Sequence, residues 1–224
     1  MTLSVGIIGL IGSGKDTFGE LLLDRLQKLE PRFQVDSYGR PLKKLGSEVL
    51  KIDPLSIDDR DIKEKEFDFR YTDEIETLLY NFMDKDLKFL GVELSEGLRK
   101  VRKNFEGVTK LSPRSFYQKF GTDVVRCTFD NAWIDLLRNN HKFHPVLARD
   151  VRFVNEMCDI NILVCRHEDI DRPEHESEHL AWDLEFAGLS TDKEVIVVFN
   201  RGTLDDLGCS ADAVTRYLKE ENYL

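Results

Sequence analysis

The chain has 224 residues, of which 41% are hydrophobic and 33% charged, a composition typical of one folded α/β domain with a sizeable core. Its formal net charge of −10 argues against a protein that coats polymeric nucleic acid, because phosphate backbones require a basic surface. No apolar run approaches the ~18 residues of a membrane helix. Four scattered cysteines, with no C-x-x-C pair, indicate reduced thiols and a cytoplasmic protein.

The N-terminal part of the chain predicts alternating strands and helices. A Val- and Ile-rich run over Leu3–Gly9 is typical of a buried parallel strand, and helical spacing of apolar residues follows over Phe18–Leu29. A short strand is expected at Val35–Tyr38. A second helix begins near Pro41, a residue that favours the first helical turn, and a third apolar stripe covers Ile75–Phe82.

The segment Met83–Lys110 is charged and has no clean period, so we interpret it as an insertion. Ser112-Pro113 then resembles a helix start, and helical spacing continues to Leu137 with an interruption expected near Gly121. Strands alternating with helices predict a three-layer α/β fold, with a parallel sheet and helices on both faces, in one domain over residues 1–224. The three remaining strands are expected at Pro145–Ala148, Ile160–Cys165 and Glu194–Phe199.

The loop after the first strand is the most informative segment. The spacing Gly9…Gly14-Lys15 matches a P-loop, in which glycines let backbone N–H groups form a concave nest for phosphate. Asp16 stands where that motif requires Ser or Thr, and Thr17 comes one residue later. The alternative is a glycine-rich turn with a chance lysine. A strand before the loop and a helix after it favour the phosphate loop.

Seven motifs follow one another along the chain. Their types and order resemble those of the deoxynucleoside monophosphate kinases of tailed phages, a subgroup of the P-loop kinases. Dephospho-CoA kinases share part of the pattern. The motifs are Gly12-Ser13-Gly14-Lys15-Asp16-Thr17, Tyr38-Gly39-Arg40-Pro41-Leu42-Lys43, Lys65-Glu66-Phe67, Arg114-x-x-x-Gln118-x-x-Gly121-Thr122-Asp123, Asp150-Val151-Arg152-Phe153-x-Asn155-Glu156, His175-x-Ser177-Glu178 and Asn200-x-Gly202-Thr203.

The resemblance implies an ATP-dependent phosphorylation of deoxynucleoside 5′-monophosphates with Mg²⁺, by a P-loop kinase fold whose charged helical insertion is 83–110. It also implies a mobile lid at about 166–180, compatibility with a homodimer, and the host cytoplasm as location if the chain is phage-encoded. Its ATP-binding residues are Gly12, Ser13, Gly14, Lys15, Asp16, Thr17, Arg166 in the lid and Asn200, which is expected to recognise adenine. Asp16 and Asp150 are the expected metal ligands.

Transfer between two phosphates requires positioning and charge neutralisation more than a strong base. We therefore expect Lys15 to stabilise the transferring group, and Arg114 and Arg152 to hold the acceptor phosphate, with Asp150 assisting as the fourth catalytic residue. The other expected acceptor-site residues are Leu42, Lys43, Lys65, Arg70, Gln118, Gly121, Thr122, Asp123, Arg126, Trp133 and Glu156. For Arg70 and Arg126 the favoured alternative is a surface ion pair. For Trp133 it is a position in the core. For Asp150 a role as a helix cap is as well supported as a role in the site.

Two histidine patterns suggest metal sites and are set aside. His175-Glu176-Ser177-Glu178-His179 satisfies H-E-x-x-H, but the sequence offers no third zinc ligand with suitable spacing. His141 and His144 are expected at the surface. Two alternatives to the assigned function stay open: another small-molecule kinase, such as a dephospho-CoA kinase, and a non-catalytic nucleotide-binding switch. A switch would need water-positioning and switch segments that we do not find in the sequence.

Overall fold

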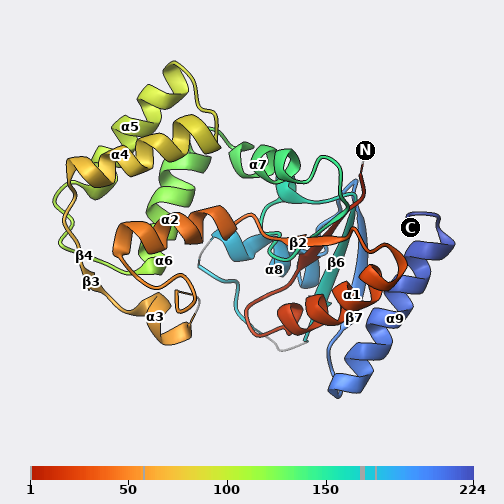
Figure 1. The fold of residues 1–224 in the computed structure, drawn as a ribbon. Helices are drawn as coiled ribbons and strands as arrows, with labels where there is room; N and C mark the ends of the chain where they lie inside the picture. Colours follow the sequence, from red (N-terminus) through yellow and green to blue (C-terminus); the bar gives the residue numbers. More distant parts are fainter. Residues whose placement is uncertain (1, 58, 167–169, 175) are drawn as a thin grey trace. The chain divides into compact units, whose positions relative to one another are not determined.

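The chain forms two compact units. The computed structural model describes residues 2–57, 59–166, 170–174 and 176–224. The first unit contains the residues up to 37 and from 139 onward, and the second contains residues 38–138. The chain therefore passes from one unit to the other only twice, after Ser37 and after Arg138. Figure 1 follows the chain from red at the N-terminus to blue at the C-terminus.

A parallel sheet forms the centre of the first unit. Its order is β2-β5-β1-β6-β7, and each neighbouring pair of strands is parallel. The predicted strands are all present, although β2 ends at Asp36 rather than at Tyr38. The strands are β1 (Ser4–Ile8), β2 (Gln34–Asp36), β5 (Val146–Ala148), β6 (Ile160–Cys165) and β7 (Glu194–Phe199).

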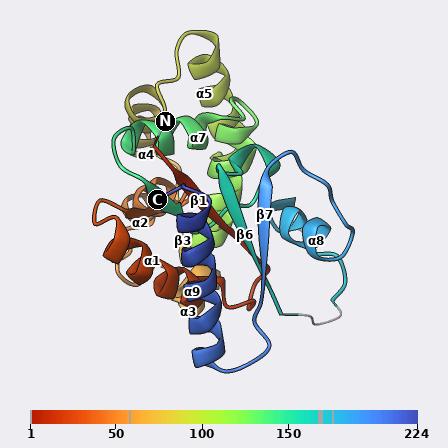
Figure 2. The ribbon, with the colours of Figure 1, turned by 90° about the vertical axis from the view of Figure 1, so that its right-hand side faces the viewer.

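Helices cover both faces of this sheet. Helices α1 (Lys15–Leu29) and α9 (Leu204–Glu220) lie together on one face, and α8 (His179–Glu185) lies on the other (Figures 1 and 2). Two single turns of 3₁₀ helix, η3 (Val154–Glu156) and η4 (Glu176–Glu178), complete the unit. The predicted α/β class, with a parallel sheet between helical layers, is confirmed.

The periodicities of strand and helix explain the core under α1. Phe18, Leu22 and Leu26 are fully buried and recur every four residues, which places them on one stripe of the helix. They meet alternate residues of the strands, such as Val5 and Ile7 of β1, and apolar residues of α9. Because side chains alternate across a strand, the residues between them face the other side of the sheet.

The second unit is mostly helical, with one two-stranded antiparallel sheet. Two segments have π-helical geometry and continue the helices that precede them. At the C-terminal end of α7 the chain returns to the first unit. The elements are α2 (Arg40–Leu50), α3 (Arg60–Glu64), β3 (Phe67–Asp68), α4 (Asp73–Asn81), η1 (Phe82–Asp86, π), α5 (Val92–Phe105), β4 (Lys110–Leu111), α6 (Pro113–Phe116), η2 (Tyr117–Arg126, π) and α7 (Ala132–Asn140).

Aromatic side chains make up much of the core of the second unit. The rings of Phe116 and Phe120 stack with their centroids 5.7 Å apart, and Phe105 packs on Phe116 at 5.9 Å. Phe82 contacts both Phe120 and Trp133. These contacts join four helical segments that lie far apart in the sequence, so the unit has a core of its own.

One expectation for this unit agrees with the structure and another is corrected. The segment Met83–Lys110, expected to be helical, contains the regular helix α5, which buries Gly97, Val101 and Phe105. The interruption expected near Gly121 is wrong, because η2 continues through this residue, where a Cβ would lie 2.5 Å from Leu42 Cδ2. That glycine allows close packing of α2 and does not break the helix.

Helix starts agree with the local sequence signals. Ser112 caps α6 by accepting a hydrogen bond from the Ser115 N–H, and Pro113 occupies the first turn. Pro41 has the same place in α2. These capping patterns depend on a few neighbouring residues, which is why they can be predicted without knowledge of the fold.

His141 is buried, with 8% of its surface exposed, which corrects the expectation of a surface residue. Its Nε2 lies 2.8 Å from the Asp36 carboxylate, whose side chain is 10% exposed. Asp36 is two residues before Tyr38, where the second unit begins, and His141 is three residues after that unit ends. The pair therefore joins, inside the first unit, the two segments that connect it with the second.

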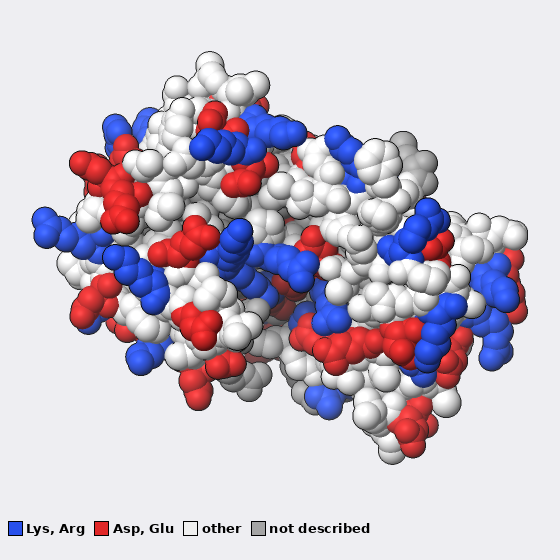
Figure 3. All heavy atoms as spheres, viewed as in Figure 1, with Lys and Arg blue, Asp and Glu red and all other residues white. Residues whose placement is uncertain are grey.

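No helix among the described residues is long and apolar enough to cross a membrane. Basic and acidic side chains are interspersed on the face drawn in Figure 3. The four cysteines are free thiols, of which two are buried. Burial, together with the nearby Glu185 carboxylate, raises the pKa of Cys165 to about 12. The buried pair is Cys158 and Cys165, and the exposed pair is Cys127 and Cys209.

Candidate functional site

The loop between β1 and α1 has a backbone that requires glycine. Gly12 and Gly14 have φ angles of 79° and 88°, in the region that residues with a Cβ rarely adopt. A Cβ at Gly9 would lie 2.5 Å from Ser13 Oγ and 3.0 Å from the Val164 carbonyl oxygen. Within the loop the Ser13 N–H donates to the Leu10 carbonyl, which closes a tight turn. The loop is therefore compact and folds back over the end of the sheet.

This turn delivers the chain into the N-terminus of a long helix. Gly14 is the N-cap of α1 and has no side chain to satisfy the first N–H groups of the helix. Those groups and the helix dipole favour an anion in front of the helix. Lys15, half-buried, is the first residue of α1, and the exposed side chains of Asp16 and Thr17 follow. A loop of this form is suited to bind phosphate.

Ser13 supports the same conclusion independently. The residue is 3% exposed, and its Oγ is buried without a hydrogen-bond partner among the described residues. A buried hydroxyl normally finds a partner, and leaving one without costs about 1–3 kcal/mol. Such an unfavourable group persists most often at functional sites.

Two residues from strand ends contact the loop. Asn200, directly after β7, donates from Nδ2 to the Ser13 carbonyl oxygen at 2.8 Å. Arg166, directly after β6, donates from Nη1 to the Gly12 carbonyl oxygen at 2.8 Å. The sequence predicted both residues near ATP, but not that their side chains bind the loop itself.

A second cluster of charge follows β5. Arg152 Nε lies 3.0 Å from Asp150 Oδ1, and its Nη1 contacts Glu178 and Ser177 at 3.1 Å each. Burial lowers the pKa of Arg152, but the nearby carboxylates outweigh this effect and raise it. Glu156 is buried and accepts the backbone N–H of Arg152 at 2.8 Å. Glu156 thus holds the Arg152 backbone, and Glu178 is a partner that sequence reasoning did not assign.

These residues meet at one edge of the sheet because the strands are parallel. Residues Gly9–Lys15, Asp150, Arg166 and Asn200 follow the carboxyl ends of β1, β5, β6 and β7. The chain leaves β1 through α1 on one face and continues from β6 to α8 on the other (Figure 2). In open α/β sheets, ligands bind outside the carboxyl ends of the strands where the connections diverge in this way.

The residues expected to bind the acceptor lie in the second unit, except Asp150, Arg152 and Glu156. Arg114 Nε contacts Glu64 at 2.5 Å, and both side chains are about half exposed, so this ion pair is weak and can exchange for another anion. Lys65 lies over the Phe67 ring at 5.4 Å. Arg126 pairs with Asp130 at 3.2 Å, but its side chain is only 10% exposed, so the pair is not the surface ion pair that was the alternative. Lys43 lies in the first turn of α2.

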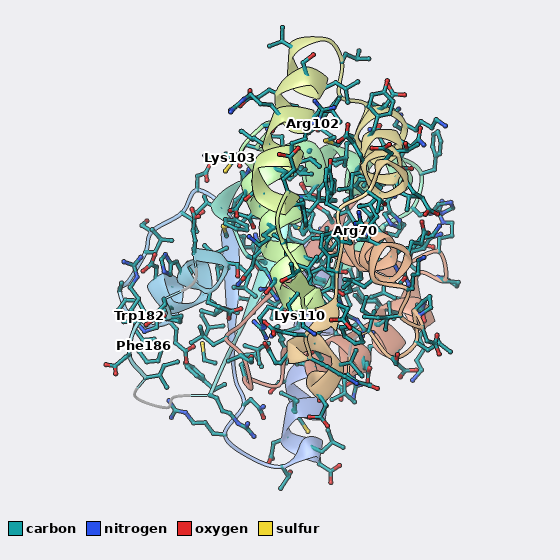
Figure 4. All side chains as sticks on the ribbon, turned by 90° about the vertical axis from the view of Figure 1, so that its left-hand side faces the viewer. Arg70, Arg102, Lys103, Lys110, Trp182 and Phe186 are labelled. Atoms are coloured by element: carbon teal, nitrogen blue, oxygen red, sulfur yellow. The ribbon has the colours of Figure 1, made fainter. Side chains whose placement is uncertain are left out.

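Arg70 is exposed and lies two residues after Asp68, the residue of β3 that pairs with Lys110 of β4 (Figure 4 labels Arg70 and Lys110). Gln118, Thr122 and Asp123 lie on η2, where Gln118 and Thr122 are half-buried and Asp123 is exposed.

Three of the expected acceptor residues pack in the core of the second unit. Leu42 is 8% exposed and lies against Gly121. Trp133 is 5% exposed and donates from Nε1 to the Gly121 carbonyl at 3.2 Å. The interpretation of Trp133 as a core residue, which its helical spacing favoured, is confirmed. These side chains can shape a site only by positioning η2.

The histidine motif does not lie on one helix. Glu176–Glu178 form the 3₁₀ turn η4, and α8 begins at His179. His179 donates from Nε2 to the Pro173 carbonyl at 2.9 Å. His175 and residues 167–169 of the expected lid lie outside the described residues. Among the described residues no group of three or more His, Cys, Asp or Glu is arranged to hold a metal.

Arg149 is a further residue that the sequence reasoning missed. Its Nε is buried without a partner among the described residues, and its Nη1 lies 3.6 Å from Glu20 Oε1 on α1. Its only sequence signal was its place directly after an apolar run. Comparison of the sequence with protein-family models and with curated proteins finds no match.

Proposed function

We propose that the chain is an ATP-dependent nucleoside monophosphate kinase of the P-loop type, which converts deoxynucleoside 5′-monophosphates to diphosphates. The observation that carries the proposal is the loop Gly9–Lys15. It combines two glycines at positive φ, a buried hydroxyl with no hydrogen-bond partner among the described residues and the open N-terminus of a 15-residue helix. Each of these features favours a bound polyphosphate.

The acceptor assignment rests on the cations outside that loop. Arg152 follows β5 at the same sheet edge, and Arg114 begins the helical segment that carries the Gln118 to Asp123 motif. A planar guanidinium suits bidentate contact with a phosphate. Both arginines are paired with carboxylates in the free protein, which keeps them oriented until a phosphate competes for them. The choice of a deoxynucleotide follows from the resemblance to phage kinases.

Phosphoryl transfer requires the protein to position the two phosphates and to neutralise their charge. The acceptor phosphate oxygen is already anionic at neutral pH, so no strong general base is needed. Lys15 and the loop N–H groups stabilise charge on the transferring phosphoryl group, and Arg152, at the same sheet edge, holds the acceptor phosphate. The role of Arg114 follows from the resemblance alone. These N–H groups and cations act through hydrogen bonds and charge, and none of them forms a covalent bond with the phosphoryl group.

Mg²⁺ fits the residues present as a companion of ATP. Asp16, exposed in the first turn of α1, and Asp150, after β5, are oxygen donors, the type that Mg²⁺ prefers. With no larger carboxylate group among the described residues, the phosphates and water would supply most ligands. When bound, the ion neutralises phosphate charge.

The test is ADP formation with a panel of acceptors, namely the deoxynucleoside and ribonucleoside monophosphates, dephospho-CoA, and no acceptor. We expect turnover with deoxynucleoside monophosphates and loss of more than a hundredfold in Lys15→Ala, which is at least ~3 kcal/mol of transition-state stabilisation. Lys28→Ala is the matched control, because Lys28 lies at the other end of α1 and pairs with Asp24. Turnover only with dephospho-CoA would contradict the proposal in favour of the first alternative, and ATP binding without ADP formation on any acceptor would contradict it in favour of the non-catalytic switch.

A further inference from the structure

We propose that Asn200 and Arg166 are positioning residues that hold the peptide groups of the phosphate loop in their binding orientation, and that Asn200 does not recognise the adenine base. The inference rests on the proposed function, because it takes the phosphates of ATP as the ligand of the loop. It differs from the role that the resemblance gives to Asn200.

Asn200 is held in place from two sides. Its backbone N–H donates to the Cys165 carbonyl at 2.8 Å, which extends the pairing of β6 and β7 by one residue. Its side chain then reaches back to the Ser13 carbonyl. The fit is close, because a Cβ at Gly14 would collide with Asn200 Nδ2. The sheet thus fixes where this amide stands relative to the loop.

The direction of the amide is determined by chemistry. The group facing the Ser13 carbonyl oxygen must be the NH₂, because an amide oxygen there would put two acceptors against each other. One of the two N–H bonds of the amide is therefore engaged with the protein backbone, which fixes the amide against the loop. This engagement gives Asn200 a structural task at the loop.

The contact with Ser13 sets the direction of the next N–H. In a trans peptide the C=O and N–H bonds point to opposite sides, and no cis peptide occurs among the described residues. Because the Ser13 carbonyl points to Asn200, the Gly14 N–H points away from it. Without the Asn200 donor this peptide group could turn, since the positive φ of a glycine allows many orientations.

Arg166 acts on the preceding peptide group. It binds the Gly12 carbonyl, while the Ser13 N–H of the same peptide donates to Leu10. Both ends of that peptide group are thus occupied. Carbonyl oxygens that faced a phosphate would repel it. Arg166 and Asn200 prevent this by binding the Gly12 and Ser13 carbonyl oxygens, Arg166 as a cationic donor and Asn200 as a neutral one. Arg166 is exposed, and solvent weakens its contribution relative to that of the half-buried Asn200.

The experiment compares three ligands, ATP, GTP and inorganic tripolyphosphate, by calorimetric titration in the presence of Mg²⁺. For Asn200→Ala we expect the affinity for all three to fall by a similar factor of roughly ten, the usual effect of losing one such hydrogen bond. Asn200→Asp keeps the shape but faces the Ser13 carbonyl with an oxygen, so we expect a larger and again uniform loss. Arg166→Ala should reduce all three affinities by a smaller factor.

One control variant and two possible results test this inference. Arg201→Ala removes a neighbouring side chain that stacks on Phe199 at 4.9 Å, and it should leave all three affinities unchanged. Loss of ATP affinity with unchanged tripolyphosphate affinity in both Asn200 variants would show base recognition and overturn this inference alone. Failure of the wild-type protein to bind any of the three ligands would overturn the proposed function as well. Thermal unfolding of each variant identifies losses caused by misfolding, and the isosteric Asn200→Asp preserves the test if Asn200→Ala does not fold.

Discussion

Replacing Gly9 with alanine tests the packing of the glycine-rich loop Gly9–Lys15 without assuming any substrate. The added Cβ would lie 2.5 Å from Ser13 Oγ and 3.0 Å from the Val164 carbonyl oxygen, compared with an ordinary contact of about 3.5–4.0 Å. Val164 belongs to β6, which is hydrogen-bonded between β1 and β7, so its backbone cannot move away. The loop must shift instead.

The expected cost follows from two opposing effects. Overpacking in a tight site costs typically about 1–3 kcal/mol, whereas the lower chain entropy of unfolded alanine returns about 0.4–1 kcal/mol. Overpacking wins, and we expect a net loss of about 1–2 kcal/mol. Ser13→Ala removes the closer contact and also a buried hydroxyl without a partner among the described residues, so it should be neutral or stabilising alone and should rescue part of the Gly9→Ala loss.

Chemical and thermal unfolding of the two single variants and the double variant measure this coupling. We expect Gly9→Ala to lower Tm by roughly 2–6 °C and the double variant to recover at least about 1 kcal/mol. Gly208→Ala is the matched control, since it lies in α9 of the same unit and its Cβ would meet only the flexible end of Arg25 at 3.4 Å. A Gly9→Ala protein as stable as the wild type, or additive single effects, would refute the packing argument.

Three further outcomes are expected. His141→Phe should cost about 3 kcal/mol in unfolding free energy measured with urea, because it leaves the Asp36 carboxylate buried without its imidazole; a loss below 1 kcal/mol would contradict the pair's role. The Arg102 guanidinium, and to a smaller extent the Tyr71 hydroxyl, holds the pKa of Glu76 below its usual value of about 4.3. The ionised Glu76 carboxylate therefore stabilises the fold above that pH, and this stabilisation disappears as the pH falls through the lower pKa of the folded protein. The free energy of unfolding of Glu76→Gln should therefore be lower than that of the wild type at pH 7, and this difference should shrink in acid. A difference that stays constant with pH would contradict the prediction. In a thiol titration with Ellman's reagent at pH 8, the two exposed cysteines should react quickly and the two buried ones only after unfolding, since the pKa of Cys165 is about 12.

Much of the fold was predictable because its signals are local. The five strands are short apolar runs, and the starts of α2 and α6 depend on prolines and a cap within one turn. The glycine-rich pattern of the loop Gly9–Lys15 is likewise contiguous, and Gly12 and Gly14 have positive φ angles. Helix was expected within 83–110, but the bounds of α5 could not be predicted because too few of its positions are buried.

The sequence by itself determined the kinds of element, the parallel sheet and the residues at the carboxyl ends of its strands. Only the tertiary structure decided what those residues touch. Asn200 binds Ser13 across 187 positions of sequence, and Asp36 meets His141 across 105. Such contacts depend on strand order and register, which the packing of the whole core selects. The spacing of residues along the chain predicts which side chains are neighbours within one helix or strand. It does not predict which strand ends lie side by side in the sheet.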